Sequence, residues 1–516
     1  MAKQRTDDLV QLINSLSRAE KRHFRLFVRR NQTNDDILFL QLFDFLEKYN
    51  QYNEELILKK LPDIKKRQLS NLKAHLYKQL LTSLRLLSKQ ENEDIQIRES
   101  IDYARVLYNK GLYLQSLSIL DKARQKALQL NFSALLVEIL DFEKHIESQY
   151  ITRSIEGRAE ELANEVDSAT LGISRNNRYS NLALKLYGLY LKLGYARNEK
   201  DFAYVRHFFY ANLPDIEFKQ LDFIGKLHYC AAFCWYNHIV QDFRMSYKYA
   251  RMWVDLYDAA PEMRYVHTTL YLKGLHNLLN ALYHALDYPR FVDALQALER
   301  AGADTQLLHT TNTEGLYHLF WYIHTINRHY LEGTFSEGLS MVPQLVALIE
   351  SNPYYWDDHR VMLFYYKIAS LYFGSGDYGQ TIHYLNLIIN PKNPDYRGDI
   401  QAFARILNLI AHFELGNEIL VEYQIKSVYR FLSKIEDLQA VQKEIFKFLR
   451  KIPVIREEAL PKEFALLRKK LLPYQNDPYE KRPFLYLDII SWLESKIQGR
   501  SVQDIVREKF LQPRNP

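Results

Sequence analysis

The sequence has few residues that break helices and few that could cross-link a fold. Gly and Pro number 17 and 15 of 516 residues, about 3% each, whereas typical proteins contain about 7% and 5%. Helix can therefore continue through most of the chain. Only two Cys are present, which excludes a disulfide framework and fits a reducing compartment. We therefore expect an all-α protein that resides in the cytoplasm.

Long apolar runs and nucleotide or metalloprotease motifs are also missing. The most apolar stretch, Leu227 to Val240, contains two His and one Asn and is too short to cross a bilayer, so it predicts a buried helix. The first residues lead into a charged segment without the apolar core of a secretory signal. No phosphate-binding Gly-rich loop and no His-Glu-x-x-His motif occurs. We therefore expect no enzyme activity, no cofactor and no membrane insertion.

Charge is distributed unevenly along the chain. Residues 1–90 carry 18 Lys and Arg against 10 Asp and Glu, and residues 451–516 carry 13 against 9. The middle of the chain is mildly acidic by difference, so basic ends flank an acidic centre. The length of 516 residues also exceeds what one compact core can fill, which predicts several domains or a repeat array.

The N-terminal segment, residues 1–97, has its own helical pattern. Ser17 and Glu20 have the spacing of a capping box at the start of a helix. Leu residues recur on one face between Lys65 and Leu87, which predicts a long amphipathic helix. We expect these residues to form a small basic domain, with a helix-turn-helix-like unit as one possible arrangement.

A turn with an aromatic residue recurs through the middle of the chain. From Phe202 onward these aromatic residues lie 41 to 47 positions apart, and Tyr113 precedes Phe202 by 89, close to two periods. The turns read Gly111-Leu112-Tyr113, Lys200-Asp201-Phe202, Asp242-Phe243, Asp287-Tyr288, Gly333-Thr334-Phe335 and Gly376-Asp377-Tyr378. A fixed period of this size is typical of helical-repeat arrays, which provide binding surfaces more often than active sites.

The segment from Ile368 to Ile382, with its Gly-Asp-Tyr turn and a small residue three positions after the aromatic, resembles a tetratricopeptide repeat (TPR). The segment from Ala104 to Ala123 is similar. The period of about 43 is longer than the 34 residues of that repeat and closer to HEAT repeats, which lack this turn. The resemblance covers residues 98–434 and implies a right-handed α-solenoid of about eight helical hairpins. Residues 435–516 would form a helical C-terminal cap.

In TPR proteins the first helices of the hairpins line a concave groove that holds a partner peptide. Carried over by position, the residues five and eight positions before each aromatic turn residue would face this groove. These candidate groove residues are Arg105, Tyr108, Asn280, Tyr283, Asn327, Tyr330, Ser370 and Phe373, with Trp235, His238 and Phe413 in equivalent places. Rings and amides of this kind could hold an extended or helical peptide. Alternatively, the same aromatic residues pack between neighbouring helices.

A second candidate surface is basic and lies in the N-terminal segment. Its residues are Lys59, Lys60, Lys65, Lys66, Arg67, Lys73 and Lys78. Lys side chains at the start of a long helix could contact a nucleic-acid backbone, and an acidic protein would fit the same surface. A solvated face of a small helical cap is the alternative interpretation.

Cys230, Cys234 and His238 follow a helical spacing, and such side chains can bind zinc. The first and last of them are about 12 Å apart along a helix axis, so one helix supplies them poorly to a single ion. Buried apolar thiols are the simpler interpretation, and we expect no metal.

The preferred hypothesis is a non-catalytic scaffold or adaptor that binds a protein or peptide in an aromatic groove. The alternative is a nucleic-acid-binding regulator of the transcription type, in which residues 1–97 contact DNA or RNA and the repeats sense or hold a partner.

Overall fold

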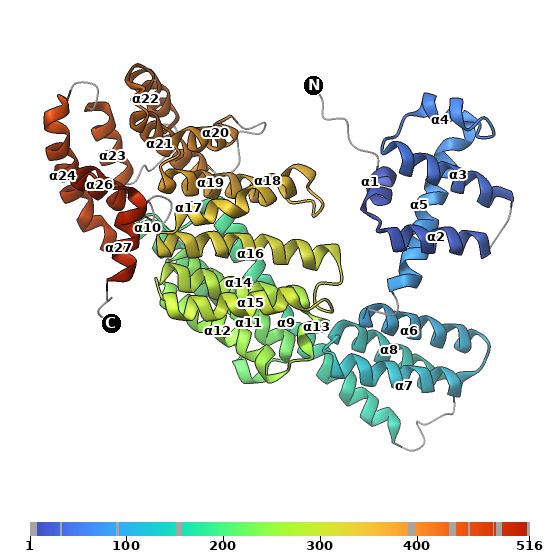
Figure 1. Ribbon diagram of the computed structural model, residues 1–516. Coiled ribbons are helices and arrows are strands. Elements are labelled where there is room, and N and C mark those ends of the chain that lie inside the picture. The colour runs from blue at the N-terminus through green and yellow to red at the C-terminus, as the bar shows by residue number, and fades with distance from the viewer. Residues whose placement is uncertain are drawn as a thin grey trace. The chain divides into compact units, whose positions relative to one another are not determined.

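The computed structural model describes residues 8–30, 34–88, 92–150, 157–390, 398–432, 440–451, 455–477, 479, 480, 484 and 488–512. These residues form helices joined by turns, and none of them lies in a β-strand. Contacts divide the chain into two compact units, Met1–Ile173 and Ser174–Pro516 (Figure 1). The all-α class predicted from the low Gly and Pro content is therefore confirmed. The three domain ranges expected from the sequence divide the chain differently and stay predictions.

The N-terminal unit contains two hydrophobic cores. Its helices are α1 (Asp8–Ser15), α2 (Arg18–Arg30), α3 (Asn34–Tyr49), α4 (Glu54–Lys60), α5 (Lys66–Ser88), α6 (Glu93–Asn109), α7 (Tyr113–Gln129) and α8 (Ser133–Gln149). The first core joins α1 to α5, and the second joins α6, α7, α8 and the start of α9 (Arg158–Leu193). The capping box at the start of α2 is confirmed, since the Ser17 amide donates to Glu20 (2.6 Å) and the Glu20 amide to the Ser17 hydroxyl (3.2 Å).

Helix α9 (Arg158–Leu193) is a single helix of 36 residues. The sequence predicted two helices here, the second of one hairpin and the first of the next. Nothing between them breaks a helix, because Gly172 and Gly188 are the only Gly residues and no Pro is present. The predicted bend before this helix, Arg153 to Gly157, lies outside the described residues except for Gly157. The hairpin boundary at Pro391 and Pro394 also lies outside them.

The C-terminal unit is a succession of packed helices. They are α10 (Glu199–Asn212), α11 (Phe223–Ile239), α12 (Phe243–Ala259), α13 (Met263–Val266), α14 (Thr268–His284), α15 (Tyr288–Ala303), α16 (Thr311–Glu332), α17 (Phe335–Gly338), α18 (Val342–Ser351), α19 (Asp358–Ser375), α20 (Tyr378–Ile389), α21 (Gly398–Glu414), α22 (Glu418–Leu432), α23 (Ala440–Lys451), α24 (Leu460–Leu471), α26 (Ile489–Gln498) and α27 (Val502–Leu511). Figure 1 shows α14, α16 and α19 stacked in sequence order, and α14 contacts α16, which contacts α19.

The recurring turn has one backbone geometry. At Gly376 the chain enters the left-handed region (φ 89°), and the amide of Asp377 donates to the carbonyl of Tyr372 (2.9 Å). The Asp377 carboxylate then accepts from the amide of Gln380 (3.0 Å) and caps the next helix. A left-handed residue followed by a side-chain cap ends one helix and starts the next within two residues.

The same geometry occurs where the sequence offers no Gly. Gln241 and Leu286 adopt φ of 61° and 55°. The amides of Asp242 and Asp287 again donate to the carbonyl five residues earlier, in the preceding helix. The turn predicted at Lys200-Asp201-Phe202 is wrong, because Asn198 caps α10 and these residues lie inside it. The start of α10 is set by the Asn198 side chain, which accepts a hydrogen bond from the amide of Asp201, and not by the recurring aromatic residue.

The last two helices pack back onto the middle of the C-terminal unit. We call α26 and α27 the C-terminal arm. Helix α27 contacts α16 and α19, and the ring of Phe510 lies 4.7 Å from that of Tyr288. The sequence predicted a cap on the final repeat. Helix α26 contacts α21 of the last predicted hairpin through Trp492 and Glu414, and α27 covers residues more than a hundred positions earlier, where Val502 and Val506 are buried. The cap itself stays a prediction.

Candidate functional site

One face of the C-terminal unit contains a cavity of about 460 Å³, which we call the cationic cavity. Helices α9, α11 and α14 supply most of its wall, and α12, α16 and α19 complete it. Its basic residues are His228, His238, Lys273, His276 and Arg360. All residues that line it belong to the described range 157–390, and no Asp or Glu is among them.

A chain of buried hydrogen bonds leads from this cavity into the protein. The side-chain amide of Asn280 donates to His276 Nε2 (3.2 Å), so His276 Nδ1 carries the hydrogen and donates to His324 Nε2 (2.9 Å). Burial and the nearby cationic groups, His238 first, lower the pKa of His276 to about 3. Burial also lowers the pKa of His324 well below its usual value. Both rings are therefore neutral at physiological pH.

Lys367 lies behind the cavity, between α16 and α19. Its ammonium group donates to Asn327 Oδ1 (2.6 Å) and lies 5.2 Å from the centre of the Tyr330 ring. Within the described part of the chain it forms no ion pair with a carboxylate. Burial lowers its pKa to about 7, because no opposite charge compensates for the lost hydration.

A second cavity of about 530 Å³, which we call the aromatic cavity, adjoins the first along α14. Tyr283, Tyr330, Ser370 and Phe373 line it, so four of the eight candidate groove residues meet there. Its opposite wall comes from the C-terminal part of the chain, and these residues are Gln475, Asn476, Phe484, Asp488, Val502 and Val506. The aromatic cavity is therefore covered by the protein itself.

Backbone contacts fix the C-terminal arm over this cavity. The Arg507 guanidinium donates to the Glu332 carbonyl (3.2 Å), and the Ser336 amide donates to Gln503 Oε1 (2.8 Å). Gly333 is so close to α27 that a Cβ atom there would be 2.5 Å from the Arg507 amide nitrogen. Such a contact permits no larger side chain at this position.

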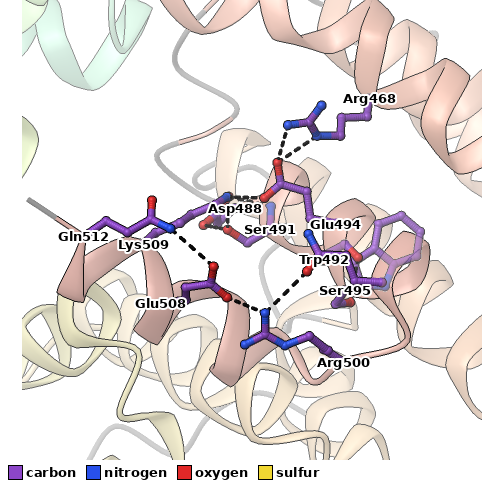
Figure 2. A network of polar contacts seen from close by, with 11 residues as sticks. Arg468, Asp488, Ser491, Trp492, Glu494, Ser495, Arg500, Glu508, Lys509 and Gln512 are labelled. Carbon is purple, nitrogen blue, oxygen red and sulfur yellow. Dashed lines mark hydrogen bonds and ion pairs between the residues drawn. The ribbon is translucent and has the colours of Figure 1, made fainter. Parts of the chain in front are cut away.

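Ion pairs hold the arm to its neighbours, as Figure 2 shows. Glu494 accepts from Arg468 (2.7 Å) and pairs with Lys509 (2.6 Å). Burial alone would raise the pKa of Glu494, but the bonds from Lys509 and Arg468 outweigh it and lower this pKa. On the other side, Trp492 Nε1 donates to Glu414 of α21 (2.6 Å). Helix α26 is thus held to α24 and to α21, and the Lys509–Glu494 pair joins the two helices of the arm.

The remaining candidate groove residues are placed separately. Asn280 lines the cationic cavity, whereas Asn327 is 2% exposed and serves as the acceptor for Lys367. Arg105 and Tyr108 belong to the N-terminal unit, where Arg105 lies over Phe142 (5.0 Å) and the Tyr108 hydroxyl bonds His145 (3.1 Å). Of the equivalent positions, Trp235 and His238 line the cationic cavity.

The basic residues of the N-terminal unit surround the start of α5. Lys59 and Lys60 end α4, Lys65 lies between the helices, and Lys66, Arg67, Lys73 and Lys78 belong to α5. All are exposed except Lys73, which lies 3.8 Å from the centre of the Tyr52 ring. Lys66 pairs with Glu54 (3.2 Å). Because α5 turns by about 100° per residue, these side chains spread over more than one face.

Cys230 and Cys234 are buried inside α11. Burial raises the pKa of the Cys230 thiol to about 12 and that of Cys234 well above its usual value. A thiol with this pKa is neither a thiolate ligand nor a nucleophile at neutral pH. In the part of the chain that the structure describes, no three His, Cys, Asp or Glu side chains are grouped to hold a metal ion.

Sequence reasoning missed several basic residues that line the cationic cavity or lie behind it. His276 precedes Asn280 by four positions, and Lys367 precedes Ser370 by three, so each shares a helix face with a residue that was selected. Extending the register by one more turn would have found them. Arg360 and Lys273 carried no comparable signal, because Lys and Arg are usually surface residues.

The chain matches no protein-family model, no curated protein and no solved structure. None of its described helices combines the length and apolar character that spanning a bilayer requires. The geometry of the cavities therefore carries the argument about function.

Proposed function

We propose that this protein is a non-catalytic scaffold or adaptor of the cytoplasm that binds a peptide segment of a protein partner. In this proposal the hairpins form a right-handed TPR-like α-solenoid, and the peptide lies on the face that the first helices share. The observation that supports it best is the contiguity of the two cavities. Asn280 lines one and Tyr283 the other, three residues further along α14.

The chemistry of this face suits a peptide. Side-chain amides such as Asn277 and Asn280 can bond to peptide carbonyl and amide groups, and the rings of Tyr187, Trp235 and Phe320 offer apolar contact area. Rings and amides with few acidic groups make a surface for recognition. No nucleophile with an adjacent base has been identified among these lining residues.

The test is selection of peptides from a random display library against the full-length protein. Enriched peptides are labelled, and their affinities are measured by fluorescence anisotropy. We expect Asn280→Ala to weaken binding about ten-fold, because a buried hydrogen bond to the peptide is lost. Asn386→Ala is the matched control, since Asn386 is exposed on α20 and lines neither cavity. Failure to enrich any peptide, or equal affinities of both variants, would contradict the proposal.

The exposed basic start of α5 favours the second candidate function, a nucleic-acid-binding regulator. Lys59, Lys60, Lys65, Lys66 and Arg67 are all exposed within a short stretch of chain. If they contact phosphates, the double variant Lys66→Glu, Arg67→Glu should weaken binding to a DNA duplex strongly and reduce the salt dependence of the binding that remains. Peptide binding should remain unchanged in this variant. Unaltered DNA binding, or none by the wild-type protein, would exclude this role.

A further inference from the structure

Charge compensation distinguishes the cationic cavity from a third cavity of similar size. A cavity of about 550 Å³ between α12, α14 and α15 is also rich in cations, but acidic residues accompany them. Its charged residues are Arg251, Arg264, Arg290, Arg300, Asp258, Asp293 and Asp304. There Arg264 pairs with Asp258 (2.7 Å). The cationic cavity has no such carboxylate in its wall, so its positive potential is available to a ligand.

The two permanent cations of the cationic cavity come from different helices. Lys273 of α14 is exposed and forms no ion pair with any described carboxylate. Arg360 of α19 has one acidic neighbour, Asp357 (3.4 Å), whose side chain is 54% exposed and lies outside the cavity wall. Two cations that line one cavity repel each other, and an anion bound between them would relieve this repulsion.

Neutral hydrogen-bond donors complete the wall. The amides of Asn277 and Asn280 lie on the same helix as Lys273. His276 stacks on Phe320 with ring centres 4.1 Å apart, which fixes the orientation of the imidazole. Amide donors beside a guanidinium and an ammonium are the groups that bind carboxylate and phosphate oxygens in proteins.

The groups behind this wall also favour negative charge in the cavity. His324 is completely buried, and its Nδ1 atom has no hydrogen-bond partner among the described residues. Because its Nε2 accepts from His276, this Nδ1 carries a hydrogen. Lys367 adds a partly buried ammonium group, which forms no ion pair with a carboxylate of the described residues and donates to Asn327. An uncompensated buried donor and ammonium are costly unless something offsets them.

We propose that the cationic cavity is an oxyanion site that binds the carboxylate or phosphate oxygens of a ligand. Lys273 and Arg360 contact the anion, and the Asn277 amide orients it. The anion is either an acidic side group of the bound peptide or a free small molecule. The site itself does not depend on peptide binding, and both sources share the same oxygen chemistry.

Lys367 links this site to protons. Its pKa is lowered to about 7, so the ammonium group is partly deprotonated at neutral pH. An anion nearby favours the charged form. The groups that surround this region are His228 and His238 of α11, Lys273, His276 and His284 of α14, His324 and Tyr330 of α16, and Arg360 of α19 itself. The carboxylate of Asp222 acts on His228, and none of the groups that line the cavity is itself a carboxylate. Binding of an anion should therefore be accompanied by proton uptake, and affinity should rise as pH falls through 7.

The first experiment is calorimetric titration of the full-length protein with sulfate, which does not titrate near pH 7. We expect saturable binding, and we expect the pair Lys273→Ala, Arg360→Ala to weaken it at least about ten-fold, because charged hydrogen bonds are lost. The matched control is Lys200→Ala, Arg244→Ala, which removes two exposed charges outside this cavity. No saturable binding by the wild-type protein, or equal weakening in both pairs, would overturn the proposal.

Two further measurements locate the anion and identify its source. Sulfate affinity is measured below and above pH 7 in the wild-type protein and in Lys367→Met. A pH dependence that disappears in the variant supports the site, whereas pH-independent wild-type affinity would place the anion elsewhere and overturn it. Competition of sulfate with an anisotropy-labelled display peptide indicates a peptide-borne anion. Sulfate binding without any selectable peptide would keep this site, identify a free small anion, and contradict the proposed function instead.

Discussion

The cationic cavity and the aromatic cavity of the C-terminal unit differ in which parts of the chain line them. Residues of α14, α16 and α19 line both cavities. The cationic cavity is lined by cations, amides and rings of α9 to α19, whereas the aromatic cavity is closed on one side by the chain's own C-terminal residues. The aromatic residues selected from the sequence thus mark an apolar surface against which the protein's own C-terminal residues pack.

The largest expected effect is the loss of stability when the contact between Gly333 and α27, beside the aromatic cavity, is disrupted. Gly333 and Gly376 both have left-handed backbone angles, but only Gly333 touches α27. Gly376→Val should cost about 1–2 kcal/mol through backbone strain alone. Gly333→Val should cost about 4 kcal/mol or more, because its side chain collides with the backbone of Arg507. Urea unfolding gives both values.

Hydrogen exchange of α27 shows where the Gly333→Val effect acts. We expect faster exchange in α27 for this variant and unchanged exchange there for Gly376→Val. Equal destabilisation by the two substitutions would mean that the arm contributes nothing to the stability of the unit.

A smaller effect concerns the charge behind the cationic cavity. The pKa of Lys367 falls from 10.5 in the unfolded chain to about 7 in the folded protein. Between these values the unfolded state binds more protons, so stability should rise with pH, by roughly 3–4 kcal/mol from pH 7 to pH 10. Lys367→Met should lose this rise, and Lys200→Met is the exposed control.

Urea unfolding of the three proteins across this pH range isolates the contribution of Lys367, because all other groups cancel in the differences. A wild-type pH dependence equal to that of Lys367→Met would show that the ammonium group is well hydrated. The distinction between a charged and an apolar cavity would then rest on Lys273 and Arg360 alone.

The smallest effect concerns a turn at the edge of the aromatic cavity. Leu286 has φ of 55°, and its side chain is 55% exposed. Leu286→Gly should stabilise the protein by about 0.5 kcal/mol, since relief of left-handed strain exceeds the added freedom of the unfolded chain. Leu286→Ala retains the strain and serves as the control. A thermal unfolding scan in which Gly is no better than Ala would contradict this account.

The helices and most of their ends could be predicted from the sequence, because the signals are local. The capping box at Ser17 and the Gly-Asp turn at Gly376 satisfy backbone groups within a few residues of themselves. The turn at Leu286 was located by Asp287 and Tyr288 although its central residue is unfavourable. Where a stronger local signal competed, as Asn198 did with Lys200-Asp201-Phe202, the periodic pattern failed.

The candidate site was only partly predictable. Tyr283, Tyr330 and Phe373 were placed on one surface by their register and do line one cavity. The position of a residue relative to the aromatic turn does not predict how deeply its side chain is buried, however. Asn327 is equivalent to Asn280 and Ser370 in this position, but its side chain is buried and accepts a hydrogen bond from Lys367. Lys273 and Arg360 converge from helices nearly ninety residues apart, which no local pattern records.

The sequence by itself determined that this protein is helical and where several of its helices end, since both depend on backbone bonds closed within one or two turns. Only the tertiary structure decided that α27 returns to line the aromatic cavity, and that cations from α14 and α19 line one cavity whose wall contains no carboxylate. Those outcomes depend on apolar burial and charge placement between distant segments. The contact energies that favour them arise only after helices distant in the sequence have packed together.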